Sequence, residues 1–196
     1  MEDYNIKTME LFKYFSETVI KNFNFLEDLD YKHRKVKNGY IQYLSKTVDI
    51  SIYYDAARSF EIDLTITLLK QNIRCYIDSI IRFCFDSDMK RQYNCAVNKE
   101  TIRNAIEEIV MILKEYGMDF IDGNENAFKT IKKQIDEEHN KLVLEGKLDM
   151  IEKQAIYAWN NKDYLTVIKL YDTILEHLTS TQRKKLEICK KYVYFE

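Results

Sequence analysis

Apolar and polar positions follow two different periods along the chain, and the change of period predicts where its elements lie. Over residues 4–26, apolar side chains recur at steps of three and four, which is typical of an amphipathic helix. These side chains are Ile6, Met9, Phe12, Phe15, Val19, Phe23 and Leu26, so aromatic rings dominate the stripe. After residue 29 the period falls to two, which is the period of a strand. We therefore expect an N-terminal helix packed on a sheet.

Residues 31–69 predict three or four antiparallel strands joined by short turns. The segment YKHRKVK is typical of an edge strand, because its charges discourage pairing with other chains. Asn38-Gly39 is a strong signal for a tight turn, and a second strand, YIQYLS, follows it. The segments VDISIYYD and SFEIDLTITLL then alternate, so one side of each should face the helix: Val48, Ile50, Ile52, Tyr54, Phe60, Ile62, Leu64 and Ile66.

From residue 72 onward the pattern predicts helices. A short helix should cover residues 73–85, and the polar segment DSDMKRQYNCAVN should form a loop. Asn98 is placed to cap a helix that ends before Gly117. A further helix should begin near Glu125 and be weakened by Gly146, because glycine favours the unfolded backbone.

The segment MIEKQAIYAWNNKDYLTVIKLYDTILEHL predicts a helical hairpin near the C-terminus. Ala155 and Ala158 would let the two helices approach, and NNKD would form the turn between them. This segment resembles one tetratricopeptide unit, but no second copy follows at a fixed period, so a solenoid is not expected. Thr179 and Gln182 are spaced as a capping box for one more helix.

These patterns together predict an α+β fold. An N-terminal helix would pack on a three- to four-stranded antiparallel meander, followed by a C-terminal all-helical bundle with the tetratricopeptide-like hairpin. We expect a sheet domain over residues 1–86 and a helical region over residues 87–196, which either packs on the sheet domain or joins it in one compact unit.

Composition and charge narrow the functional classes. Hydrophobic residues make up 46% of the 196 residues, which supports a packed core, and the helix breaker proline is absent. Residues 1–86 carry 12 basic and 13 acidic side chains, and residues 87–196 carry 18 and 19. No segment has the basic excess of a nucleic-acid-binding domain, so no nucleic-acid partner is expected. No run approaches the roughly 18 apolar residues of a membrane span, and no signal peptide is evident, so we expect a cytoplasmic protein without a membrane partner.

The sequence contains no recognisable set of catalytic, phosphate-binding or metal-binding residues. With four glycines, the chain has no glycine-rich motif that would hold a phosphate group. The three histidines lack the spacing of a metal site, and Glu137-Glu138-His139 has no second histidine four residues away. The four cysteines lack a CxxC pair and should be reduced, with Cys75, Cys84 and Cys189 in the core and Cys95 in the loop. We therefore expect neither an enzyme nor a cofactor or metal.

Two neighbouring strands place polar side chains on the side opposite the helix. These candidates for partner binding are Asp49, Ser51, Tyr53, Asp55, Glu61 and Asp63. One interpretation is an ordinary polar sheet face in contact with water. The other is an acidic docking surface for a basic protein partner, since such patches raise association rates and select against wrong partners.

The helical C-terminal region offers a second set of candidates. Aromatic residues of the hairpin would be available for contact with a peptide or a partner helix: Tyr157, Trp159, Tyr164 and Tyr171. A short basic run follows on the last expected helix: Arg183, Lys184, Lys185, Lys190 and Lys191. It is either a solvated helix end, favoured by the helix dipole, or a contact for an acidic partner or nucleic acid.

Two stretches of the sequence resemble segments of bacterial protein families. FNFLEDLDYKHRKVKNGYIQYLSKTVDISIYYDAARSFEIDLTI resembles uncharacterised bacterial families found among immunity and defence genes, including partners of polymorphic toxins. AIEEIVMILKEYGMDFIDGNENAFKTI looks like the continuation that such proteins carry, so the resemblance covers residues 23–131. The quoted motifs consist of turns, strand faces and caps, and no catalytic residue comes with them.

The sequence thus supports three functional hypotheses. The first is a non-catalytic, cytoplasmic protein-binding protein of the immunity type, which neutralises a bacterial toxin through the acidic sheet face. The second is a helical adaptor that binds a peptide or partner helix through the C-terminal hairpin. The third is an enzyme of an unfamiliar type, which the missing motifs disfavour.

Overall fold

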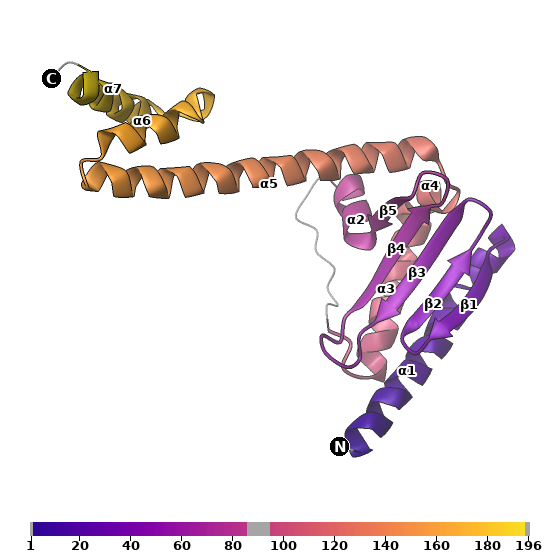
Figure 1. The fold of residues 1–196 in the computed structure, drawn as a ribbon. Coiled ribbons are helices and arrows are strands. Elements are labelled where there is room, and N and C mark those ends of the chain that lie inside the picture. Colours follow the sequence, from indigo (N-terminus) through magenta and orange to yellow (C-terminus); the bar gives the residue numbers. More distant parts are fainter. Residues whose placement is uncertain (1, 86–94, 195–196) are drawn as a thin grey trace. The chain divides into compact units, whose positions relative to one another are not determined.

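The computed structural model describes residues 2–85 and 95–194, and its fold is α+β, as predicted (Figure 1). The elements in chain order are α1 (Glu2–Asn22), the 3-10 helix η1 (Asn24–Leu29), β1 (Lys32–Lys37), β2 (Tyr40–Leu44), β3 (Val48–Tyr54), β4 (Ile62–Leu68), β5 (Ile73–Tyr76), α2 (Ile77–Phe85), α3 (Lys99–Tyr116), α4 (Met118–Ile121), α5 (Glu125–Asn160), α6 (Tyr164–Asp172), the 3-10 helix η2 (Leu175–His177) and α7 (Ser180–Tyr194).

The sheet is an antiparallel meander of five strands in the order β1-β2-β3-β4-β5. The prediction of three or four strands was therefore one or two strands short, and β5 was missed because residues 73–76 were expected to begin a helix. Within β5, Ile73 and Cys75 are buried while Arg74 and Tyr76 are exposed. Four residues are too few for the sequence pattern to separate a strand from a helix.

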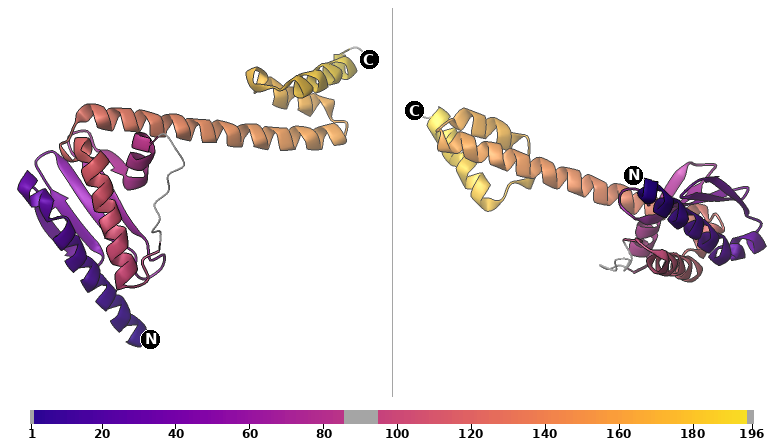
Figure 2. Two further views of the ribbon diagram at one scale, coloured as in Figure 1. Left: turned by 180° about the vertical axis from the view of Figure 1, so that it is seen from behind. Right: turned by 90° about the horizontal axis from the view of Figure 1, so that it is seen from below.

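Helices α1 and α3 cover one face of the sheet, as Figure 2 shows from behind. Phe15 of α1 and Phe23, which follows α1, pack on inward-facing tyrosines. The ring centroids are 5.3 Å apart for Phe15 and Tyr54 and 5.8 Å apart for Phe23 and Tyr43. The predicted packing of the N-terminal helix on the sheet is thereby confirmed. Residues 48–54 and 62–68 bury the predicted alternating positions against this layer, while Phe60 lies outside β4 and is partly buried.

Local turn and capping signals in the sequence are confirmed. Gly39 has a φ of 71°, a left-handed conformation that glycine adopts readily at a hairpin turn. The side chain of Asn98 accepts a hydrogen bond from the backbone N–H of Thr101, and α3 ends at the residue before Gly117. At α7, Thr179 and Gln182 form the expected capping box. Of the expected loop after α2, residues 86–94 lie outside the described residues.

Contacts divide the chain into two compact units, residues 1–135 and residues 136–196. The sequence placed a boundary at residue 86, whereas α3 packs with α1 and β4 in the first unit. Helix α5 begins in the first unit and continues into the second, through Gly146. A single helical glycine costs about 1 kcal/mol, which evidently does not end a helix of 36 residues.

The second unit has its own apolar core, built from the C-terminal part of α5, from α6 and from α7. Ala155 and Ala158 are buried at the helix contact, as the hairpin pattern predicted. Asp163 caps α6 by accepting a hydrogen bond from the N–H of Thr166. The hairpin is therefore present as a packed helix pair, with α7 added to it.

All four cysteines are free thiols, but they differ in burial. Cys75 and Cys189 are buried, as expected, and Cys95 is exposed. Cys84, near the end of α2, is also exposed, contrary to expectation, and its thiol lies 3.8 Å from the carbonyl oxygen of Tyr116. None of the helices in the described parts of the chain is both long and apolar enough to cross a bilayer.

Candidate protein-binding face of the sheet

The side chains that point away from α1 and α3 form a face of the sheet that we call the outer face. In Figure 1 strands β1 to β4 lie in front, and no other helix or strand of residues 2–135 passes over them. The strand register arranges the outer face in three rows across the sheet. The rows are Tyr40, Tyr53 and Asp63; then Arg34, Gln42, Ser51, Thr65 and Tyr76; and then Lys32, Leu44, Asp49, Thr67 and Arg74.

Asp49 is held in place by a chain of hydrogen bonds between β2 and β3. Its Oδ2 accepts from Gln42 Nε2 at 2.5 Å, and its Oδ1 accepts from the hydroxyl of Ser51 at 2.7 Å. The Ser51 oxygen lies 3.0 Å from the hydroxyl of Tyr40. Side chains linked in this way lose little further freedom when a partner binds.

Tyr40 and Tyr53 form the most prominent aromatic feature of the outer face. Their rings are stacked, with centroids 4.8 Å apart and an angle of 22° between the planes. Burial raises the pKa of Tyr40 above its ordinary value. Tyr53 remains 37% exposed, and its ring is therefore accessible to a partner.

The other predicted acidic residues take different positions. Asp63 lies on β4, where its carboxylate accepts a hydrogen bond from the N–H of Leu64. Asp55 lies in the connection after β3, where it accepts from the N–H groups of Ala57 and Arg58. Glu61 is exposed just before β4. The structure thus joins Asp49 to Ser51, but Asp55 and Glu61 belong to the loop end.

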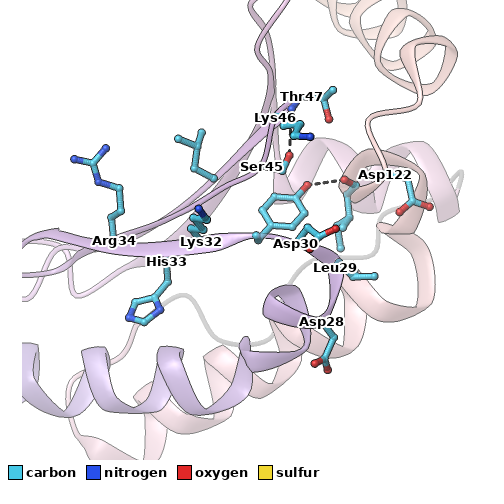
Figure 3. A pocket seen from close by; sticks show the side chains of 13 residues that line it. Asp28, Leu29, Asp30, Lys32, His33, Arg34, Ser45, Lys46, Thr47 and Asp122 are labelled. Atoms are coloured by element: carbon cyan, nitrogen blue, oxygen red, sulfur yellow. Dashed lines mark hydrogen bonds between the residues drawn. The ribbon is translucent and has the colours of Figure 1, made fainter.

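Sequence reasoning missed the basic residues of the same face. Arg34 is the register partner of Gln42, and Arg74 is the register partner of Thr67. Figure 3 shows Arg34 and His33 pointing to opposite sides of β1, and His33 lies on the inner side against Glu27 at 3.0 Å. Carboxylates therefore occupy the middle strands β3 and β4, and cations occupy the edge strands β1 and β5. For Arg34, the Asn38-Gly39 turn could have shown this in the sequence, because the turn sets the register of β1 on β2.

An open groove of about 1240 Å³ lies at the end of β1 and β2 (Figure 3). Tyr31 forms part of its wall, and its hydroxyl donates to the backbone carbonyl of Ile121 at 2.5 Å. Burial raises the pKa of Tyr31 to about 12. Charged residues of both signs line the groove together with His33: Asp28, Asp30, Lys32, Arg34, Lys46 and Asp122. Such a mixed lining indicates no single ligand chemistry.

The aromatic candidates of the C-terminal hairpin differ in accessibility. Tyr157 is 74% exposed, beside a hollow of about 530 Å³ between α5 and α6. Tyr171 is 1% exposed, and its hydroxyl donates to Glu152, so it belongs to the core and not to a binding surface. Trp159 and Tyr164 are partly buried against the same core.

Residues 2–85 and 95–194 contain no group of three or more His, Cys, Asp or Glu side chains arranged to hold a metal ion. Comparison with known proteins found no matching family model, no matching curated protein and no matching solved structure. The resemblance of residues 23–131 to immunity and defence families therefore stays a sequence-based prediction.

Proposed function

We propose that this chain is a non-catalytic protein-binding protein whose partner docks on the outer face of the sheet. The observation that carries the proposal is the stacked pair Tyr40 and Tyr53 beside the hydrogen-bonded carboxylate of Asp49. Tyrosines of this kind supply large contact area at low entropic cost and are common at the centres of protein interfaces.

The distribution of charge favours a partner with a basic centre. Asp49 and Asp63 lie on the middle strands, and the exposed Glu61 follows at the loop end. Arg34 and Arg74 lie on the edge strands. A basic group of the partner over the centre would meet carboxylates, and acidic groups around it would meet the arginines. Charge complementarity of this kind steers association and fixes the orientation of the complex.

The more specific form of the proposal is an immunity protein that neutralises a bacterial toxin in the cytoplasm. It is supported by the resemblance of residues 23–131 to immunity and defence families and by the absence of catalytic motifs from the sequence. A toxin that acts on nucleic acid would present a basic groove, which the carboxylates of the outer face would cover.

The partner can be sought among proteins encoded beside this gene, and the outer face can then be tested by calorimetric titration. Tyr53→Ala removes the exposed ring of the stacked pair, and we expect it to weaken binding by about tenfold or more. Tyr157→Ala, an equal truncation on the second unit, is the matched control and should change affinity by less than about twofold. Asp49→Asn should weaken binding mainly through slower association, and more so at low salt. Unchanged binding by both outer-face variants would refute the proposal.

A helical adaptor is the second candidate, and the exposure of Tyr157 favours it. This ring lies against a hollow that Lys153, Gln154, Thr166 and Leu170 also line. A partner helix could place an apolar side chain there. The same pair of variants separates the two functions, since an adaptor would lose affinity with Tyr157→Ala and keep it with Tyr53→Ala.

A further inference from the structure

The basic run on α7 is only partly explained by contacts within the chain. Arg183 donates hydrogen bonds to the carbonyls of Leu175 at 3.0 Å and Leu178 at 3.2 Å, so it closes the turn before α7. Lys190 forms an ion pair with Asp172 at 3.3 Å. Lys185 lies over the ring of Trp159, and Lys184 and Lys191 are exposed on the surface of the helix. The helix dipole favours cations only in the last turn, which includes Lys191 but neither Lys184 nor Lys185.

Three aromatic rings from three different helices meet beside these lysines. The Trp159 and Tyr164 rings meet edge to face with centroids 5.8 Å apart, and the Tyr164 and Tyr192 rings are stacked with centroids 4.8 Å apart. The ammonium of Lys185 lies 5.9 Å from the centre of the Trp159 ring. Tyr192 is 48% exposed, so the aromatic cluster reaches the protein surface.

The exposed side of α7 continues this cluster with an apolar residue among cations. Lys185, Ile188 and Tyr192 follow at steps of three and four, so they share one side of the helix. Lys184 and Lys191 are one turn before and after Ile188, and both are exposed. Ile188 itself is 42% exposed. Glu187, the sole carboxylate of α7, neighbours Lys184 and Lys191 on the side of the helix away from Lys185 and Tyr192.

We propose that this lysine–aromatic face binds an acidic amphipathic helix of a partner protein. The face consists of Trp159, Tyr164, Lys184, Lys185, Ile188, Lys191 and Tyr192. An apolar side chain of the partner would lie on Ile188 and the edge of Tyr192, and its flanking carboxylates would meet the three lysines. The inference concerns the second unit, and it depends on neither the outer face of the sheet nor the hollow beside Tyr157.

The arrangement of the rings favours a peptide over single-stranded nucleic acid. Bases bind such proteins by stacking on open faces of aromatic side chains. Here Tyr164 and Tyr192 stack on each other, and Lys185 lies over Trp159. An apolar residue at the centre of the lysines also matches an amphipathic peptide better than a phosphate backbone.

Trp159 provides the readout, because it is the single tryptophan of the chain and forms part of the proposed face. The probe is a synthetic helical peptide of about 16 residues, with leucines along one stripe and glutamates on both sides of it. We expect it to change the Trp159 fluorescence saturably, with an affinity that falls as salt is added. The same peptide with glutamine in place of glutamate should bind about tenfold more weakly.

Two double variants of the full chain then locate the site. Lys184→Glu with Lys191→Glu should weaken binding of the glutamate peptide by about tenfold or more. Lys141→Glu with Lys147→Glu, on exposed positions of α5, makes the same change in net charge and should leave binding within about twofold. All four lysines are exposed, so circular dichroism should show that both variants fold.

Three results would overturn this proposal: no saturable change, equal loss of binding in both double variants, or tighter binding of an oligothymidine than of the peptide. The test is independent of the proposed function. The Tyr53→Ala variant should bind the peptide as the unmodified chain does.

Discussion

The hydroxyl of Tyr171 on α6 donates a hydrogen bond to the carboxylate of Glu152 on α5, at 3.1 Å. The same carboxylate oxygen also accepts from Gln182 of α7, so one side chain links the three α-helices of the second unit. Tyr171 is 1% exposed, and hydrogen bonds to charged groups contribute about 1.5–3 kcal/mol when buried. This linkage should therefore be important for the stability of the unit.

Tyr171→Phe removes the hydroxyl and keeps the ring, so we expect it to lower the free energy of unfolding of the second unit by about 1–3 kcal/mol. Denaturant unfolding followed by the fluorescence of Trp159, which lies in this unit, measures the change. Tyr157→Phe makes the same chemical change at a side chain that is 74% exposed and should have no measurable effect. Equal stability of both variants would contradict the structural role given to Glu152.

Buried tyrosines should make the first unit sensitive to alkaline pH. Burial raises the pKa of Tyr31 and of Tyr54 from 10.0 to about 12. Above pH 10 the unfolded chain therefore loses protons that the folded chain still holds, so the contribution of these two tyrosines to stability should be constant below pH 10 and be lost between about pH 10 and 12. The slope is at most about 1.4 kcal/mol per pH unit for each such tyrosine.

Denaturant unfolding at a series of pH values tests this, and ultraviolet absorbance of tyrosinate in the native protein follows ionisation directly. Tyr54→Phe should reduce the alkaline loss of stability, whereas Tyr157→Phe should leave it unchanged. A native protein in which every tyrosine ionises near pH 10 without unfolding would contradict the burial of these hydroxyls.

Two glycines should respond to alanine in opposite directions. At Gly39 a Cβ would meet the carbonyl of Tyr54 and the ring of Phe12, and the φ of 71° is unfavourable for alanine, so Gly39→Ala should destabilise the first unit by about 1–3 kcal/mol. At Gly146 a Cβ would meet nothing within 4 Å inside a continuous helix. Gly146→Ala should therefore stabilise α5 by about 0.5–1 kcal/mol. Thermal unfolding by circular dichroism gives both signs, and a stabilising effect of Gly39→Ala would contradict the hairpin geometry.

The four thiols should react with an alkylating reagent in two groups. Cys75 is buried, and burial raises its pKa to about 12, so it should be protected in the native protein. Cys189 is buried as well and should also be protected. Cys95 is exposed and should be modified first. Cys84 is exposed as a residue, but partial desolvation of its sulfur and then the charge of Asp119 raise its pKa, so it should react more slowly. Peptide mass spectrometry after timed alkylation measures the order, and denaturant should make all four equivalent.

Much of the first unit could be predicted because its signals act over short distances. The alternation in β3 and β4 depends only on the two-residue period of a strand, and the Asn38-Gly39 turn and the Asn98 cap each involve a few consecutive residues. Strand β5 was not predicted because it has four residues and α2 follows it directly, with no turn residue to mark the boundary. The continuation of α5 through Gly146 was not predicted. The cost of one glycine in the helix is smaller than the stability of the helical residues on either side of it.

The candidate sites could be predicted only in part, because some of their residues are brought together by contacts between distant segments. Alternation placed Asp49, Ser51 and Tyr53 on one side of a strand, but the arginines that share this face come from strands whose positions depend on pairing across the sheet. No local pattern indicated that Trp159, Tyr164 and Tyr192 would meet, since they lie on three helices.

The sequence by itself determined the class of the fold, the faces of its longer strands and the ends of several helices, because periodicity and capping are properties of neighbouring residues. Only the tertiary structure decided which charges share the outer face, which rings surround Ile188 and how Glu152 joins three helices. Those relationships arise between residues far apart in the chain, and they depend on how whole elements pack and not on the preference of any one segment.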